Sequence, residues 1–268
     1  DWRIADSAAK RRLVVLVSQQ EHCLYDLLAR WQSKELDVEI PCVISNHETF
    51  RGFVEWHGIP FHHVPVTAEN KHEACAEMAR LFEQSRGDIM VLARYMQILP
   101  PELCEKYPGR IINIHHSFLP SFVGAKPYHQ AYRRGVKLIG ATCHFVTAEL
   151  DAGPIIEQDT VRIDHGDTVE DLVRYGKDIE KAVLARGLRY HVEDRVLLNG
   201  NRTVVFRCQE GGAGAPPAVT PLPARRRLAV AFLAAAPAYL DALPARALQL
   251  AAPPALHPSV LADLALAG

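Results

Sequence analysis

The amino-acid sequence predicts an α/β protein of the Rossmann-like class, with a mostly parallel open sheet and helices on both of its faces. Short apolar runs such as Leu13–Val17 and Ile89–Ala93 lack the polar alternation of a half-exposed strand, which is typical of strands buried on both sides. Between these runs lie segments such as residues 22–32, in which apolar side chains recur at helical spacing. Alternation of the two patterns indicates a parallel sheet covered by helices.

Five apolar runs in the first half of the chain are the expected strands, at Leu13–Val17, Val38–Ile44, Phe61–Val66, Ile89–Ala93 and Ile111–Ile114. Helices are expected between them at 22–32, 48–57 and 70–85, and a further short helix opens at Pro101-Glu102. The helix at 70–85 is predicted from its charged, amphipathic pattern. Asn46 is the expected N-cap of the helix at 48–57, because an Asn side chain can accept a hydrogen bond from a free backbone N–H of the first turn.

The second half of the chain departs from this simple order. After Pro127 we expect a short helix, strands at Lys137–Val146 and Pro154–Ile163, a long helix at about 168–192 and a hairpin within Val196–Phe206. An Asn-Gly pair at Asn199-Gly200 favours the tight turn of that hairpin. The final helix and hairpin break the alternation, so the sheet is expected to be mixed.

Proline content divides the 268 residues into two compositions. Nine of the 18 prolines lie in residues 209–268, where Ala, Leu and Pro together account for 39 of the 60 residues. Pro237 and Pro244 interrupt any long helix there. We therefore expect a leader at 1–10, one domain at 11–207 that is large enough to form a full hydrophobic core, and an Ala/Pro/Leu-rich, largely irregular tail at 208–268.

Charge, apolar runs and cysteine spacing exclude several kinds of protein. The formal net charge is −1, so we expect no nucleic-acid partner, and no apolar run approaches the roughly 20 residues of a membrane span. No signal peptide is recognised at the first residues, Asp1-Trp2-Arg3. The six cysteines are widely spaced without a C-x-x-C pair, which favours reduced, buried thiols in a cytoplasmic protein.

Ligands of open α/β sheets bind beyond the carboxyl ends of the strands. The segments expected at those ends are Ser18–His22, Ser45–His47, Arg94–Leu99 and Asn113–Ser117. Asn113 and His115 are two apart in a strand, so their side chains are expected to point to the same side. An amide can stabilise an oxyanion and an imidazole can move a proton near neutral pH, although a solvated strand end explains both residues equally well.

A loop carboxylate provides a second chemical group. Asp151 lies between the two expected strands of the second half and precedes Gly153-Pro154. An Asp at such a position is usually a turn former, and it gains a chemical role only if the loop folds over the end of the strand that carries His115. His144 is either a satisfied core histidine or a second imidazole of the site.

These residues carry a resemblance. The pattern N-I-H-x-S-x-L-P from Asn113, followed by H-x-V-x-x-x-x-D-x-G-P-I-I from His144, resembles the formyltransferase family that uses 10-formyltetrahydrofolate. The deformylase branch of that family is the one that the sequence most resembles at residues 43–47, 58–61, 91–99 and 124–132. The resemblance extends from about Arg11 to Phe206 and implies a catalytic trio of Asn113, His115 and Asp151.

The resemblance also implies a folate cleft. Substrate-binding residues are then expected in the loop Met96, Gln97, Ile98 and Leu99, and at His116, His144, Val146 and Thr147. Core packing is the alternative for the three apolar members of that loop, and a simple turn role is the alternative for His116. No metal is expected, because the three histidines of this region lack a recognisable carboxylate ligand spacing.

The junction after the first strand distinguishes the possible reactions. Members that transfer the formyl group to glycinamide ribonucleotide carry a glycine-rich turn there, which holds the phosphate of the acceptor at a helix N-terminus. Here the junction is Ser18-Gln-Gln-Glu21-His22-Cys23, without glycine and with a negative charge at Glu21. The tRNA-dependent members need a basic face, which a near-neutral chain does not provide.

Hydrolysis of 10-formyltetrahydrofolate to formate and tetrahydrofolate is therefore the expected activity, which supplies formate for purine synthesis and balances one-carbon pools. The alternatives are formyl transfer to an amine such as glycinamide ribonucleotide, and a non-catalytic folate-binding protein. The folate is the substrate and no cofactor is expected; a homo-oligomer is possible. The resemblance implies that a small N-terminal regulatory domain of the ACT type is missing, so control by amino acids is not expected.

Overall fold

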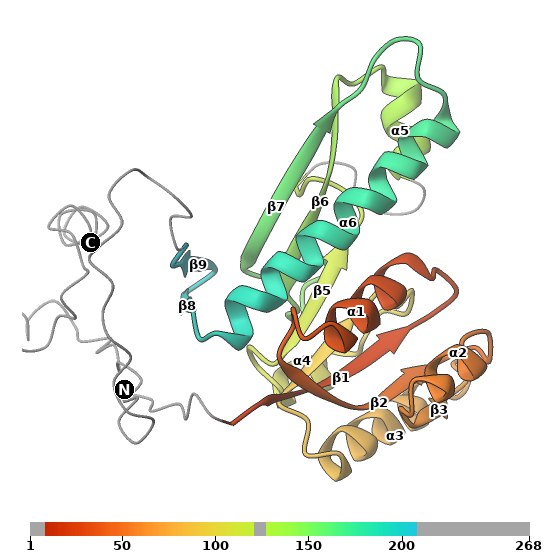
Figure 1. Cartoon of the computed structure of the whole chain (residues 1–268), viewed down its shortest axis with the longest axis vertical. Coiled ribbons are helices and arrows are strands. Elements are labelled where there is room, and N and C mark those ends of the chain that lie inside the picture. Colours follow the sequence, from red (N-terminus) through yellow and green to blue (C-terminus); the bar gives the residue numbers. More distant parts are fainter. Residues whose placement is uncertain (1–8, 121–126, 208–268) are drawn as a thin grey trace, which may run out of the picture. The chain divides into compact units, whose positions relative to one another are not determined.

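Apolar, β-branched runs form one seven-stranded sheet in the computed structural model, which describes residues 9–120 and 127–207 (Figure 1). The strands are β1 Arg11–Val17, β2 Val38–Ser45, β3 Phe61–His63, β4 Ile89–Leu92, β5 Ile111–His115, β6 Leu138–Phe145 and β7 Ile155–Arg162. Their order is β3-β2-β1-β4-β5-β6-β7; β6 pairs antiparallel with both β5 and β7, and the other neighbouring strands pair parallel. The expected mixed, Rossmann-like sheet is confirmed.

Helices cover both faces of the sheet, as expected. They are α1 His22–Gln32, α2 Arg51–Trp56, α3 Lys71–Gln84, α4 Pro101–Lys106, α5 Pro127–Arg134 and α6 Val169–Val192. Side chains of β1 alternate between two cores: Leu13 and Val15 pack in the core formed with α1 and α6, whereas Val14 and Leu16 pack in the core formed with α3 and α4. Every apolar residue of β1 is thus buried, which explains its continuous apolar run.

The long helix α6 packs along β6 and β7 and reaches α5 (Figure 1). Thr168 caps α6 by accepting a hydrogen bond from the N–H of Asp171, whose carboxylate accepts one from the N–H of Thr168 in return. The hairpin β8 Val196–Asn199 and β9 Arg202–Val205 forms a small sheet of its own. None of the helices within residues 9–120 and 127–207 combines the length and the apolar character needed to cross a membrane.

Three details differ from the sequence prediction. The helix expected at 48–57 begins only at Arg51, and Asn46 does not cap it, because the Asn46 side chain accepts a hydrogen bond from the Ser18 hydroxyl at 2.7 Å. The third strand ends at His63, since Pro65 has no N–H to extend the ladder. The hairpin turn is one residue later than expected, at 200–201.

Two expected segments lie wholly or mostly outside the described residues. Of the leader at 1–10, only residues 9 and 10 are among the described residues, and the tail expected at 208–268 lies outside them.

Close packing of α6 against β6 depends on a glycine. A Cβ at Gly187 would lie 2.5 Å from the Cys143 sulfur, whereas a Cβ at Gly52 in α2 would meet nothing within 4 Å. We expect Gly187→Ala to lower the free energy of unfolding by about 1–3 kcal/mol because the added methyl overpacks the interface. Gly52→Ala, the matched control, should leave it unchanged or raise it by up to about 1 kcal/mol. Urea unfolding of both variants measures the difference, and equal stabilities would contradict this packing.

Candidate active site

Strand β5 brings three polar side chains to the carboxyl edge of the sheet. Asn113 and His115 lie on the same side of the strand, as its two-residue period predicts, and both line one cavity. His116 follows directly, and its ring centroid lies 5.1 Å from that of His115. Both imidazoles are buried, so their hydrogen-bond partners decide what they can do.

Antiparallel pairing of β6 with β5 places His144 opposite Asn113. The Nδ1 atom of His144 lies 2.8 Å from the carbonyl oxygen of Phe145, which can only accept, so Nδ1 carries the proton. Nε2 of the neutral ring is then an acceptor, and the Asn113 amide donates to it at 3.2 Å. This hydrogen bond orients the Asn113 amide and leaves its second N–H for another acceptor.

The loop after β6 turns back towards β5 and brings a carboxylate with it. Asp151 has a φ of +54°, a left-handed conformation that is uncommon for a residue with a side chain. A Cβ at Gly153 would lie 1.8 Å from the carbonyl oxygen of Phe145, so only glycine permits the close approach at the base of the loop. Next to it, the N–H of Phe145 donates to the carbonyl oxygen of Pro154 at 2.9 Å. The backbone therefore determines where Asp151 points.

The Asp151 carboxylate lies between two imidazoles. Its Oδ1 atom is 3.3 Å from Nδ1 of His115 and 3.8 Å from Nε2 of His144. Burial alone would raise the pKa of Asp151, but the hydrogen bond and charge of His115, together with the neighbouring His144 and His116, outweigh it, and the net pKa is lowered from its ordinary value. Asp151 is accordingly ionised at neutral pH and holds the Nδ1 proton of His115.

The opposite nitrogen of His115 is available for chemistry. Nε2 of His115 is buried and has no hydrogen-bond partner among the described residues. With the proton on Nδ1, Nε2 carries the lone pair and can accept a proton from a bound molecule. Burial, and next the charge of Arg94, lower the pKa of His116 to about 3, so His116 stays neutral beside this base.

All the residues that the sequence predicted for the site line a single cavity of about 270 Å³. They are Met96, Gln97, Ile98, Leu99, Asn113, His115, His116, His144, Val146, Thr147 and Asp151. Met96 and Ile98 are 53% and 57% exposed, so core packing, the alternative for this loop, is wrong for these two. It is correct for Leu99, which is buried in the core shared with α3 and α4.

Two residues near the cavity were not given a role from the sequence. Arg94 lines the cavity with a φ of +61°, and its Nε lies 3.2 Å from a carboxylate oxygen of Glu180. Ser18 accepts a hydrogen bond from the N–H of Met96 at 2.9 Å and so fixes the start of the loop after β4. Both lie at strand ends, where the general rule for α/β sheets places ligands, but no local pattern marks their contacts.

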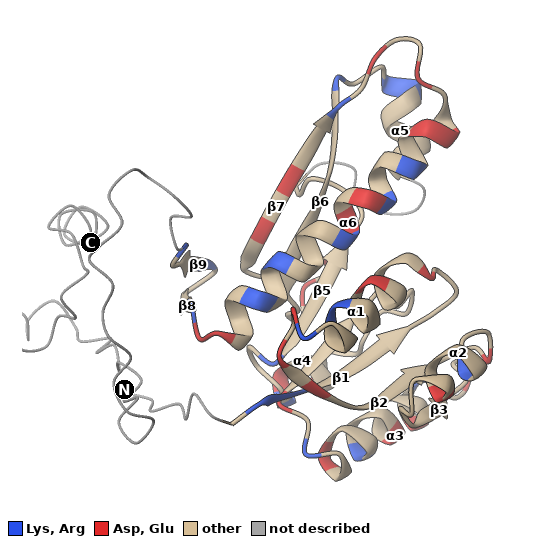
Figure 2. Ribbon diagram, in the orientation of Figure 1, with Lys and Arg blue, Asp and Glu red and all other residues tan. Residues whose placement is uncertain are grey.

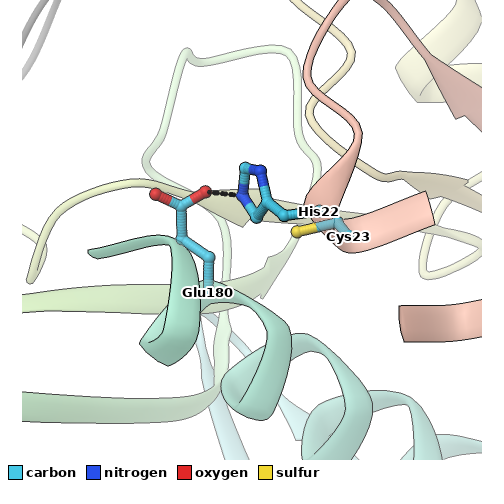
Figure 3. Close-up of side chains that lie close together, drawn as sticks. All are labelled: His22, Cys23 and Glu180. Carbon is cyan, nitrogen blue, oxygen red and sulfur yellow. Dashed lines mark hydrogen bonds and ion pairs between the residues drawn. The ribbon is translucent and has the colours of Figure 1, made fainter. Parts of the chain in front are cut away.

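One group of buried side chains has the residue types of a metal site. Within the described residues, His22, Cys23 and Glu180 form the group whose ligand atoms all lie within 4.8 Å of one another (Figure 3). Burial raises the pKa of the Cys23 thiol well above its ordinary value, and the Glu180 carboxylate already accepts hydrogen bonds from His22 and Tyr128. Both oxygens of the Glu180 carboxylate are engaged in these hydrogen bonds, so we assign this group to a hydrogen-bond network.

Burial of His116 has a consequence for pH dependence. Its pKa of about 3 lies below the value of about 6.5 in an unfolded chain, so below pH 6.5 the unfolded state binds a proton that the folded state does not. The free energy of unfolding should therefore fall as pH drops from 6.5 towards 4. His116→Gln should reduce that slope by about 1.4 kcal/mol per pH unit near pH 5, measured by urea unfolding. His165→Gln, on the surface, controls for loss of an imidazole, and an unchanged slope in His116→Gln would refute a buried neutral ring.

Comparison with known proteins agrees with this geometry. Residues 11–188 match the family model described as formyl transferase. Over 206 residues the chain is 53% identical to a formyltetrahydrofolate deformylase of Synechocystis sp., covering 76% of this chain and 72% of the relative.

Two solved structures are informative. The structure of a formyltetrahydrofolate deformylase from Pseudomonas syringae pv. tomato has a TM-score of 0.76 and 65% identity, over 77% of this chain and 70% of that one. That of glycinamide ribonucleotide transformylase 1 from Symbiobacterium toebii has a TM-score of 0.70 and 31% identity, over 74% of this chain and 95% of that one. The chain therefore belongs to the formyl transferase family and is most alike, among these three, to the two relatives that are named formyltetrahydrofolate deformylases.

Proposed function

We propose that this chain hydrolyses 10-formyltetrahydrofolate to formate and tetrahydrofolate. The observation that carries the proposal is the convergence of Asn113, His115 and Asp151 on one cavity, with Nε2 of His115 left without a partner among the described residues. An amide donor, an imidazole base and an ionised carboxylate are the groups that hydrolysis of a formamide requires. Identity of 53% to a relative named formyltetrahydrofolate deformylase supports the same reaction.

In the first step a water molecule attacks the formyl carbon. Nε2 of His115 takes a proton from the water as its oxygen bonds to that carbon, and Asp151 stabilises the resulting imidazolium through Nδ1. The formyl oxygen becomes an oxyanion, which accepts a hydrogen bond from the second N–H of Asn113. The first N–H stays on His144, so the donor is oriented before charge develops.

In the second step the tetrahedral intermediate collapses. The carbon–N10 bond breaks while His115 returns its proton to N10, which gives tetrahydrofolate, and formic acid ionises to formate. No electrons are transferred, so a redox cofactor has no part in this scheme. The neutral His116 beside His115 adds no positive charge next to the imidazolium, which keeps proton transfer between water and N10 favourable.

The loop after β4 is the proposed seat of the pteridine ring. Exposed Met96 and Ile98 offer apolar surface at the rim of the cavity, and Val146 and Thr147 line it on the side of the loop after β6. Backbone groups of residues 96–99 would recognise the polar edge of the ring. The side chains of this loop therefore need only shape and apolar character.

The proposal extends to the role of the chain in the cell. Residues 11–207 would form the catalytic domain, and released formate would supply purine synthesis and balance one-carbon pools. The five described cysteines are free and buried, which supports the cytoplasmic location that cysteine spacing predicts.

Formyl transfer to an amine is the second candidate, because the similar structure from Symbiobacterium toebii is named a glycinamide ribonucleotide transformylase. The assay that separates the two is formate release from 10-formyltetrahydrofolate with and without glycinamide ribonucleotide. We expect the same rate of formate release in both and no formylated amine. Formylated glycinamide ribonucleotide as the main product would overturn hydrolysis, and folate binding without any turnover would favour a non-catalytic protein.

The trio can be tested by substitution. Asp151→Asn keeps the size of the side chain but removes the charge that holds the Nδ1 proton, and His115→Ala removes the base. Each should lower kcat for formate release by about 100-fold or more at an unchanged melting temperature. Asp178→Asn in α6, an exposed carboxylate with a surface lysine partner, is the matched control and should keep full activity. Near-normal turnover in either trio variant would contradict the roles assigned here.

A further inference from the structure

The chain leaves the sheet directly after it has delivered an imidazole base to the catalytic cavity. Strand β5 ends at His115, and residues 116–119 belong to no helix or strand. The His115 ring has the Asp151 carboxylate 3.3 Å away, and the His116 ring has the rings of His115 and Tyr128 as neighbours. With so few polar contacts of their own, both imidazoles depend for their position on the backbone that carries them.

Backbone groups of residues 117–119 are bonded to two side chains of the neighbouring strands. Thr142 of β6 donates its hydroxyl proton to the carbonyl oxygen of Ser117 at 2.9 Å and accepts from the N–H of Leu119 at 3.1 Å. Gln158 of β7 donates from Nε2 to the carbonyl oxygen of Leu119 at 3.1 Å and to the Thr142 hydroxyl at 2.9 Å. We call Thr142 and Gln158 the anchor, because together they hold this segment from two strands.

The anchor lies in the same cross-strand row as the imidazole base. Antiparallel pairing places Thr142 opposite His115 of β5 and opposite Gln158 of β7. Directly opposite residues of paired strands project from the same face of a sheet, so these three side chains leave the sheet on one side. The strand ladder and the anchor therefore act together on the end of β5.

Burial and hydrogen bonding fix the hydroxyl at the centre of the anchor. Strand β6 carries no Lys, Arg, Asp or Glu and is tan along its length in Figure 2, and two of its polar side chains, Thr142 and His144, face His115 and Asn113. Thr142 is fully buried. Its hydroxyl has one proton to donate and two lone pairs to accept with, and all three are in use. A hydroxyl so fully bonded holds its partners in fixed directions.

The anchor acts on the cavity through the backbone. The described lining of the catalytic cavity includes His115 and His116 but neither Thr142 nor Gln158, so the anchor has no contact with a bound substrate. Its bonded segment begins at Ser117, the residue that follows the two imidazoles. Displacement of that segment would therefore move both rings.

We propose that Thr142 and Gln158 are positioning residues for the hydrolysis, which hold the backbone after β5 so that Nε2 of His115 faces the attacking water. Proton transfer needs this alignment, since a misplacement of about 1 Å in a catalytic constellation can lower a rate by about 100-fold. The inference rests on the proposed function. The hydrogen bond from His115 to Asp151, which the anchor also positions, can be measured without any substrate.

The first test removes the hydroxyl of the anchor without changing its shape. Thr142→Val replaces the hydroxyl by a methyl group, and Thr142→Ser keeps it. We expect kcat for formate release to fall by about 10- to 100-fold in Thr142→Val with KM within about twofold, and kcat to stay within about threefold in Thr142→Ser. An unchanged kcat in Thr142→Val, an equal loss in both variants, or a loss confined to KM would overturn the positioning role.

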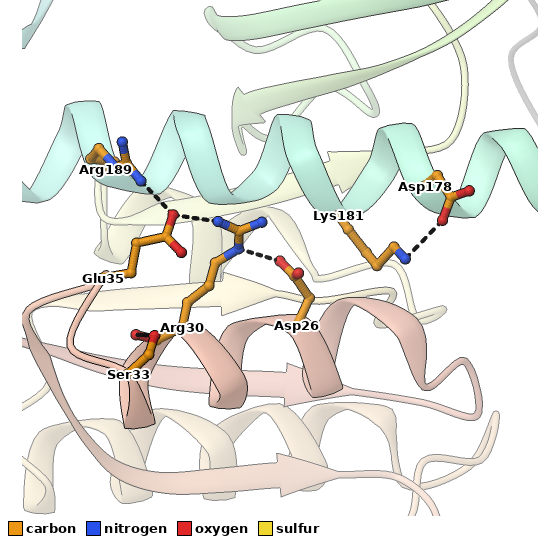
Figure 4. A network of polar contacts seen from close by, with 7 residues as sticks. All are labelled: Asp26, Arg30, Ser33, Glu35, Asp178, Lys181 and Arg189. Carbon is orange, nitrogen blue, oxygen red and sulfur yellow. Dashed lines mark hydrogen bonds and ion pairs between the residues drawn. The ribbon is translucent and has the colours of Figure 1, made fainter.

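Two control variants separate the anchor from loss of a hydroxyl and from loss of stability. Thr160→Val removes an exposed hydroxyl of β7, opposite Gly140, that has no hydrogen bond among the described residues. Glu35→Gln weakens the polar network in which Glu35 accepts from Arg189 of α6 at 2.5 Å and from Arg30 of α1 (Figure 4). Neither network nor hydroxyl contacts residues 117–119, so both variants should keep full kcat.

The second test observes the imidazole directly. In the isotope-labelled chain, NMR detects the Nδ1 proton of His115 that is bonded to Asp151, and its loss in His115→Ala assigns it. Gln158→Met removes both amide donors from a partly exposed position and so serves even where Thr142→Val does not fold. We expect this resonance to shift or broaden in Gln158→Met and Thr142→Val, and to stay unchanged in Thr160→Val.

The two tests separate the anchor from the proposed function. An unchanged Nδ1 resonance in the folded anchor variants would overturn the anchor while hydrolysis stands. A resonance that responds to both substitutions, in a chain that releases no formate, would support the anchor and overturn the proposed function instead.

Discussion

The register between β5 and β6 determines the catalytic centre, because it places the His144 imidazole opposite the Asn113 amide. Successive side chains of a strand point to opposite faces, so a slip of one residue would move His144 to the other side of the sheet. The same register ends β6 opposite Ile112 and places Val146, the first residue of the following loop, beside Ile111; the loop then turns back to His115 through the left-handed backbone of Asp151. One strand pairing therefore positions both the oxyanion donor and the carboxylate that orients the base.

Burial then decides what these groups offer to a substrate. Desolvation lowers the pKa of His144, so its ring is neutral and presents a lone pair to Asn113. If His144 were protonated, its Nε2–H would face the amide nitrogen, and Asn113 would have to rotate its oxygen into that contact. The N–H donor for the formyl oxygen would be lost in that rotation. The protonation state of a residue that never touches the formyl group thus controls the residue that does.

Periodicity was sufficient to predict the fold and part of this site, and its limits are physical. A two-residue strand period predicts that Asn113 and His115 point together, but the path of the loop to Asp151 is not encoded in local spacing and was inferred from a family resemblance. The capping role predicted for Asn46 is wrong, because the competing Ser18 hydroxyl lies on another strand end. Glu180 gave no signal at all, since its partners, the hydrogen-bond donors His22 and Tyr128 and the cation Arg94, come from three distant segments.

The buried Glu180 is hard to explain by stability. Taking an ionised carboxylate and its partners out of water costs several kcal/mol, and well-packed apolar side chains of similar volume are often at least as stable. The Glu180 network also lies at a particular place, between the β1–α1 junction and the imidazoles of the catalytic cavity, rather than in the apolar cores of the sheet. Directional hydrogen bonds to Glu180 hold His22 and Tyr128 at fixed positions in a way that apolar contacts would not. The network thus fixes the start of α1 against α6, while the continuous apolar cores on both faces of β1 supply the stability of the sheet.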